Sequence, residues 1–183
     1  MAAATFAVAA ISATEPSGYY SSCEGKTGKA LLQHLETVIG NHTVVSYKNL
    51  YTVYDDSDRH PDGTIWDMYS TKNWGKNFGS AKCANFSVVG DCINKEHSFP
   101  KSWFDDKSPM MSDAFHIYPT DGKVNGQRSN YPYGECANGT FLPSNGSVRP
   151  LGKLGASTFP GYSGTVFEPD DQYKGDFARS YFY

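Results

Sequence analysis

Apolar side chains recur at helical spacing near the start of the chain. Residues 28–39 place leucine, valine and isoleucine side chains on one face, Thr27 stands at a cap position and Gly40 at the stop. This pattern predicts an amphipathic helix over residues 28–39 whose apolar face belongs to the core. Two further helices are predicted, an aromatic one over residues 47–54 and a terminal one over residues 171–183.

The strand-like segments are shorter and are separated by polar stretches. Residues 64–69, 92–99 and 114–118 are predicted to be strands. Residues 72–90 and 138–164 are rich in glycine, serine, asparagine or proline and are predicted to be loops. The chain is therefore expected to form one α+β domain with long loops, and long loops often carry function.

Charge and composition narrow the class of protein. Sixteen Lys and Arg against nineteen Asp and Glu give a net charge of −3, which excludes a globally basic coat for nucleic acid. No apolar run approaches the ~20 residues of a membrane span, so no membrane partner is expected. The aromatic content of 15% argues against disorder.

Both ends of the sequence differ from the middle. Residues 1–13 are small and apolar, and are interpreted as the remnant of a secretory signal that ends at Ser12-Ala13, although a basic leading region is missing. An apolar tail is the alternative interpretation. Residues 14–183 are expected to form the domain, cut short within its last helix.

The four cysteines do not have the short spacing of a structural zinc site. Their even number after a signal-like segment suggests disulfides in an oxidising compartment. Cys83 and Cys92 are the favoured pair, and Cys23 with Cys136 would follow by elimination. Free buried thiols are the alternative.

Two segments combine groups suited to phosphodiester hydrolysis. Residues 94–103 (NKEHSFPKSW) and 112–130 hold two of the five histidines, a glutamate, a metal-competent asparagine and an arginine. A neutral histidine can activate water near pH 7. Carboxylate and amide oxygens can hold a hard cation such as Mg²⁺, which keeps several waters.

The predicted elements constrain how these groups can meet. In a regular strand Glu96 and His97 point to opposite faces, so a common site requires the strand to end or twist there. Thr120 is predicted to cap a short helix that carries Asn125 and Arg128. The expected arrangement is strand, loop, strand, short helix.

The sequence EHSFPKSW followed by HIYPTDGKVNGQRSNYPYGE closely resembles the bacterial endonuclease I family. Phe167-Glu168-Pro169 and the segment YKGDFAR resemble its downstream part, and looser similarity runs from about Tyr19 to the chain end. The resemblance implies a secreted or periplasmic nuclease with a ββα-metal (His-Me finger) core embedded in helices and long loops.

Carried over by position, the resemblance implies three catalytic residues and two metal ligands. His97 is the expected general base, Arg128 a phosphate contact and His116 a neighbouring orienting residue. Glu96 and Asn125 are the expected ligands of one divalent cation, Mg²⁺ or another such as Mn²⁺ or Ca²⁺.

Two alternatives stay open for side chains around this site. Arg128 could instead form an internal ion pair with Asp113 or Asp121. Most aromatic residues are expected in the core, although Trp103 or Tyr131 could stack on a base.

The function implied is a monomeric endonuclease that cuts DNA, with RNA as a second substrate. Its sequence specificity should be low, because contacts with phosphates carry no sequence information. The alternative is a non-catalytic extracellular binding module or a decayed nuclease fragment, which retention of Glu96, His97 and Asn125 together argues against.

Overall fold

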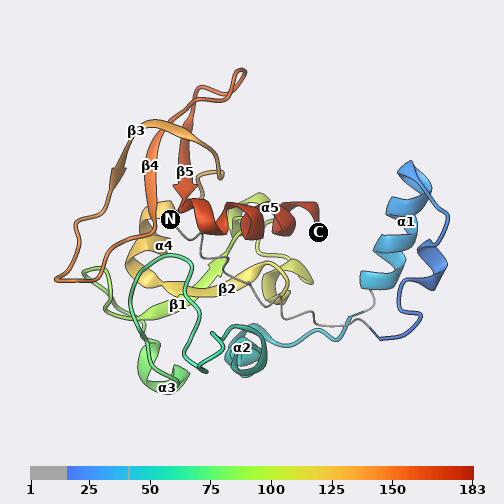
Figure 1. Cartoon of the computed structure of the whole chain (residues 1–183), viewed down its shortest axis with the longest axis horizontal. Coiled ribbons are helices and arrows are strands. Elements are labelled where there is room, and N and C mark those ends of the chain that lie inside the picture. The colour runs from blue at the N-terminus through green and yellow to red at the C-terminus, as the bar shows by residue number, and fades with distance from the viewer. Residues whose placement is uncertain (1–15, 41) are drawn as a thin grey trace, which may run out of the picture. The chain divides into compact units, whose positions relative to one another are not determined.

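The computed structural model describes residues 16–40 and 42–183 (Figure 1). The chain divides into two compact units, residues 1–43 and 44–183, which are described separately. The signal predicted over residues 1–13 lies outside the described residues. No helix in the described part of the chain is long and apolar enough to cross a membrane.

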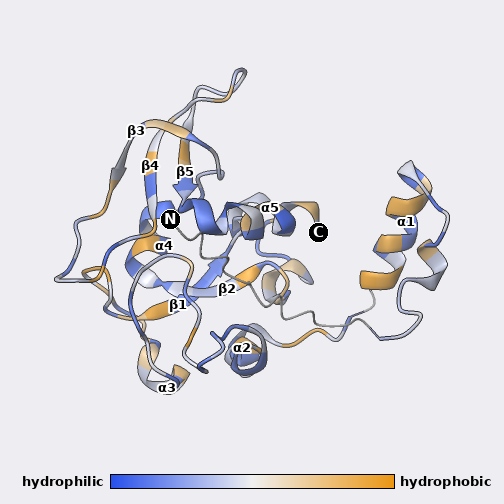
Figure 2. Cartoon of the chain, viewed as in Figure 1, coloured by the Kyte–Doolittle hydropathy of each residue, from blue (hydrophilic) through white to orange (hydrophobic). Residues whose placement is uncertain are grey.

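The first unit contains a short 3₁₀ turn, η1 (Ser21–Cys23), and the helix α1 (Gly28–Ile39). The bounds predicted for this helix are confirmed, and Figure 2 shows its apolar residues in orange. The prediction that α1 forms core is wrong, because none of its side chains is buried. The described residues of this unit are too few to enclose a core of their own.

In the second unit helices and small sheets are mixed, which confirms the α+β class. Strands β1 (Ile93–His97) and β2 (Ile117–Asp121) pair antiparallel, with Glu96 opposite Tyr118. Helix α4 (Gly122–Arg128) follows β2 without a break (Figure 1). The first strand lies where the sequence predicts it. The second begins later than predicted, because the side chain of Asp113 accepts the Phe115 N–H and forms a turn there.

The second sheet has three antiparallel strands in the order β3 (Cys136–Phe141), β4 (Gly152–Ser157) and β5 (Thr165–Pro169). The loop prediction is wrong for residues 138–141 and 152–157, which belong to β3 and β4, whereas residues 142–151 and 158–164 lie outside the strands as expected. The glycines in β4 serve close packing. A Cβ at Gly152 would overlap the ring of Phe167, and one at Gly155 would lie 2.9 Å from the Ala137 carbonyl oxygen.

The remaining elements surround these sheets. They are η2 (Tyr47–Asn49), α2 (Leu50–Ser57), α3 (Phe78–Ala81), η3 (Lys101–Trp103), η4 (Met110–Ser112), η5 (Asp171–Tyr173) and α5 (Lys174–Phe182). The aromatic and terminal helices are therefore confirmed, and α3 interrupts the loop predicted over residues 72–90. The strand predicted over residues 64–69 is absent from the described structure, where Ile65 and Ser70 form only isolated bridges.

Two hydrophobic clusters hold the β1–β2–α4 unit in place. The first joins α2 and α3 to the strands through Leu50, Tyr54, Phe78, Ile93 and Ile117. The second joins α4 to β5 and α5 through Val124, Phe167 and Phe177. Because each cluster buries side chains from several elements, β1, β2 and α4 are fixed relative to one another.

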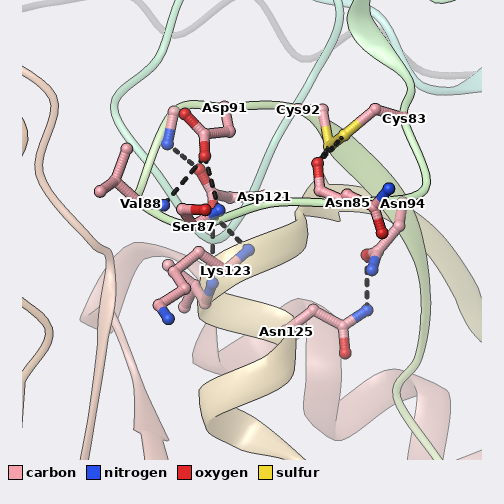
Figure 3. Close-up of a disulfide and its surroundings, with 12 residues drawn as sticks. Cys83, Asn85, Ser87, Val88, Asp91, Cys92, Asn94, Asp121, Lys123 and Asn125 are labelled. Atoms are coloured by element: carbon pink, nitrogen blue, oxygen red, sulfur yellow. Dashed lines mark hydrogen bonds between the residues drawn. A yellow bond between two sulfur atoms is a disulfide. The ribbon is translucent and has the colours of Figure 1, made fainter.

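A disulfide joins Cys83 to Cys92 immediately before β1, with Cα atoms 5.6 Å apart (Figure 3). The favoured pairing is thus confirmed. The second pairing, expected by elimination, is wrong, because Cys23 and Cys136 are free thiols. These two residues belong to different units of the chain.

The packing of β4 predicts opposite effects for two glycine substitutions. Gly152→Ala should lower the free energy of unfolding by about 1–3 kcal/mol, because the methyl group meets the Phe167 ring. Gly175→Ala is the matched control within α5, where the new methyl faces only the flexible end of Arg179. That change should raise stability by about 0.5–1 kcal/mol. Urea unfolding measures both values, and equal effects would contradict this account of β4.

A buried carboxyl predicts a pH dependence of stability. Burial raises the pKa of Asp58 to about 6, although Ser57 Oγ donates a hydrogen bond to it. A raised folded-state pKa gives stability that is complete below the ordinary value of about 3.8 and is lost as pH rises through about 6. Asp58→Asn should therefore gain about 1–3 kcal/mol relative to wild type between about pH 4 and about pH 7. A pH-independent difference in urea unfolding would refute this.

Candidate active site

The end of β1 and the middle of α4 line one pocket of about 250 Å³. Glu96, His97 and Asn125 all contribute to its wall. Glu96 and His97 are neighbours in sequence, yet both reach the pocket because β1 ends at His97. The structure therefore brings together the expected base and both expected ligands. His116 and Arg128 are not among the residues lining this pocket.

The carboxylate of Glu96 is buried and held from one side. Its Oε1 accepts hydrogen bonds from Arg128 at 2.5 Å, Tyr69 at 2.7 Å and Tyr133 at 3.3 Å. Burial raises the pKa of Glu96, whereas the Arg128 guanidinium lowers it. Among the described residues no hydrogen bond reaches Oε2, which leaves that oxygen for a ligand in the pocket.

Arg128 is fully buried and its guanidinium donates five hydrogen bonds. The acceptors are Glu96 Oε1, Tyr181 Oη and the carbonyl oxygens of His97, Ser98 and Tyr131. Its guanidinium carbon also lies 4.4 Å from the centroid of the Tyr133 ring. With every donor engaged, Arg128 is placed as an internal partner and not as a contact for substrate phosphate. The ion pair is with Glu96, and not with Asp113 or Asp121 as the sequence suggested.

His97 is held in one tautomer by its neighbours. Its Nε2 lies 3.2 Å from the Met111 carbonyl oxygen, which can only accept, so Nε2 carries the proton and Nδ1 the lone pair. The Tyr47 ring stacks on the imidazole with centroids 5.7 Å apart. Burial lowers the pKa of His97 to about 4, which outweighs the opposite effect of the hydrogen bond. The imidazole is therefore neutral at pH 7, as a general base must be.

His116 packs behind His97, with ring centroids 5.7 Å apart. Its Nε2 donates to the Met110 carbonyl oxygen at 2.8 Å, and its Nδ1 is buried without a partner in the described structure. Its own carbonyl accepts from the Ser98 N–H at 2.9 Å. This position suits a residue that supports the His97 ring and the chain after β1 from behind.

Asn125 projects from α4 toward β1 (Figure 3). Its Nδ2 donates to Asn94 Oδ1 at 2.7 Å, so the amide oxygen is the atom left for another partner. Asn94 lies two residues before Glu96 on β1, and this hydrogen bond joins the two elements that carry the expected ligands.

The cap of α4 is one residue later than predicted. Asp121, and not Thr120, is the N-cap, and its Oδ1 accepts from the N–H groups of Lys123 and Val124 at 2.9 and 3.1 Å. Its Oδ2 accepts from Gly90 N–H at 2.6 Å. Figure 3 shows this cap beside the disulfide loop, so α4 is tied at its start to the segment that leads into β1.

Several groups that build the site carry no signal in the sequence. The carbonyls that orient the two histidines come from η4, and a backbone carbonyl is not specified by residue type. Tyr69 and Tyr133 reach Glu96 from segments 27 and 37 residues away. A spacing pattern within one segment cannot reveal such contacts.

The donor set fits a hard cation that keeps most of its water. Glu96 Oε2 and Asn125 Oδ1 are oxygen donors at one pocket, as Mg²⁺ prefers. No cluster of three or more His, Cys, Asp or Glu side chains suited to a metal ion occurs in residues 16–40 and 42–183. One carboxylate and one amide would suit only an ion that keeps most of its water ligands.

Comparison with known proteins identifies the family. A sequence model of Endonuclease I matches residues 27–183. The chain belongs to the Endonuclease I family. The chain is also 33% identical over 173 residues to an extracellular ribonuclease of Bacillus subtilis (strain 168), covering 90% of the chain and 51% of that protein. An extracellular ribonuclease of Bacillus amyloliquefaciens is 31% identical over 171 residues, with the same coverage.

The chain thus spans about half the length of the curated relatives it matches. No solved structure matches it significantly. The family named from EHSFPKSW and the following motif is confirmed.

The position of Arg128 predicts a structural phenotype. Arg128→Met should lower the free energy of unfolding by about 3–5 kcal/mol, because it leaves the Glu96 carboxylate buried without its partner. Arg179→Met is the matched control, since Arg179 forms an exposed ion pair with Asp176 that should contribute less than about 1 kcal/mol. Thermal and urea unfolding measure both. A stable Arg128→Met protein with a raised KM would instead indicate substrate contact.

Proposed function

We propose that this chain is a metal-dependent endonuclease that hydrolyses phosphodiester bonds of DNA and RNA. The observation that carries the proposal is the convergence of Glu96, His97 and Asn125 on one pocket. The names of the two relatives support RNA as a substrate. The arrangement of β1, β2 and α4 supports a ββα-metal core, with the cation at the junction of strand and helix.

His97 is the general base in the proposed reaction. Its Nδ1 accepts a proton from the attacking water, while Nε2 keeps its hydrogen bond with the Met111 carbonyl. The carbonyl fixes the tautomer before reaction, so no rearrangement of protons is needed on the imidazole. His116 keeps the ring in place from behind.

Glu96 Oε2 and Asn125 Oδ1 would hold the divalent ion, which when bound would supply positive charge to neutralise the phosphate and the leaving oxygen. Arg128 is a positioning residue in this scheme, because it fixes Oε1 and thereby turns Oε2 to the pocket. Lys101 lines the pocket with a half-exposed side chain and is the proposed phosphate contact in place of Arg128.

The names of the two relatives and the disulfide support a location outside the cytoplasm for the proposed enzyme. Both relatives are named extracellular, and the Cys83–Cys92 bond requires an oxidising compartment. We propose that the chain acts outside the cytoplasm as a monomer, with low sequence specificity because its pocket reads phosphates.

Cleavage assays with substitutions at the pocket test this function. His97→Ala should lower kcat for plasmid nicking and for RNA cleavage by about 10²–10⁴-fold, since removal of a general base costs that much. His60→Ala, an exposed histidine outside this pocket, is the matched control and should cut like wild type. Chelation of divalent ions should abolish cleavage. Equal cleavage by His97→Ala and wild type would show that His97 is not the general base.

Metal titration separates the ligand role from the base role. Asn125→Ala should need about 10–100-fold more Mg²⁺ for half-maximal cleavage, because one of the two oxygen ligands is lost. His97→Ala should keep the wild-type Mg²⁺ requirement in its residual activity. An unchanged requirement in Asn125→Ala would contradict its assignment as a ligand.

A further inference from the structure

A wide groove of about 890 Å³ lies beside the catalytic pocket, and aromatic side chains form much of its wall. Trp103, Tyr131, Phe159 and Tyr162 line it and are all exposed, Phe159 by 71%. Exposed aromatic residues that gather in one groove are unusual for a surface without a ligand. Their flat faces suit a partner that is itself flat and aromatic.

The groove adjoins the catalytic pocket. Asn130 lines both, and its Nδ2 lies 3.5 Å from Ser102 Oγ. The 3₁₀ helix η3 also links the two cavities, because its residues Lys101 and Ser102 line the pocket and Trp103 lines the groove. A chain molecule held in the pocket therefore has its next units beside Trp103.

The groove and the catalytic pocket differ in the charged side chains that line them. Among the described residues that line the groove, Glu135 is the one charged side chain, and it pairs with Lys174 at 2.7 Å. The catalytic pocket instead contains Lys95 and Lys101, and the charge of Glu96 in its wall is compensated by Arg128. Lys101 also forms an exposed ion pair with Asp106 at 3.4 Å. Phosphates are thus favoured in the pocket, whereas the groove favours uncharged aromatic groups.

We infer that this aromatic groove binds the unstacked bases of a single-stranded nucleic acid whose backbone lies in the catalytic pocket. The inference rests on the proposed nuclease function. Bases in a duplex stack on one another and are not free to enter the groove, so single strands are bound more tightly than duplexes. Base stacking on exposed aromatic rings is tolerant of sequence, as a nuclease of low specificity requires.

Kinetics on matched substrates test the groove. Phe159→Ala and Trp103→Ala should each raise KM for a single-stranded DNA oligonucleotide about tenfold, the loss expected for one stacked base. KM for the same sequence as a duplex should change less than about twofold. Trp103 also packs on Phe99, with centroids 5.1 Å apart, so the more exposed Phe159 provides the variant that should not disturb folding.

Phe141→Ala is the matched control, an exposed phenylalanine on β3 that does not line the groove. It should leave both KM values as in wild type. Equal rises for single strand and duplex in Phe159→Ala, or values that match those of Phe141→Ala, would overturn the inference.

Direct binding separates this inference from the nuclease function. Fluorescence anisotropy of a fluorescein-labelled single-stranded oligonucleotide, measured with chelator present, reports binding without cleavage. Weaker binding by Phe159→Ala than by Phe141→Ala supports the groove even if wild type cleaves nothing, in which case only the nuclease function fails. Cleavage by wild type with equal binding by the two variants rejects the groove and keeps the nuclease.

Discussion

The buried ion pair between Glu96 and Arg128 is the interaction on which the site depends. Removing two charges from water is costly, and here the cost is offset by a short contact and by further hydrogen bonds to both partners. The same guanidinium donates to the carbonyls of His97, at the end of β1, and of Ser98, and to the hydroxyl of Tyr181 on α5. One side chain thus joins the strand end, the short helix and the terminal helix, and it orients the carboxylate that faces the pocket.

The sequence predicts more of the candidate site than of the fold around it. Glu96, His97 and Asn125 lie in two short motifs, and the resemblance of these motifs to endonuclease I implies a common site. The strand pattern alone would place Glu96 and His97 on opposite faces. The partner of Arg128 was assigned wrongly because Glu96 lies 32 residues away, and which acid it meets depends on the pairing of β1 with β2. Strand β4 was missed because glycine ordinarily signals a turn, whereas Gly152 makes room for the ring of Phe167.

The net negative charge of the chain is compatible with an enzyme that acts on nucleic acid, because a substrate meets the charges near the pocket and not their sum over the chain. Lys153 pairs with Glu168, and Lys174 pairs with Glu135, Glu168 and Asp171, so these two lysines add little to a long-range field. Near the pocket Lys95 and Lys101, together with the proposed cation, would be enough to hold one phosphate. The remaining affinity can then come from uncharged surface, which is the character of the neighbouring groove. Such an enzyme loses little affinity as salt rises, since few counterions are released.

The shortness of α4 has a consequence for how the family can vary in length. Helix α4 begins at the Asp121 cap, presents Asn125 to the pocket and ends with Arg128 against Glu96. Each residue added or removed within the helix would turn the following side chains by about 100°. An insertion before Asn125 would rotate Asn125 and Arg128 away from their partners, and one after it would change the angle between them. Substitutions at the partly buried Lys123 and Gln127 leave this geometry intact, but an insertion or deletion between positions 121 and 128 disrupts the site.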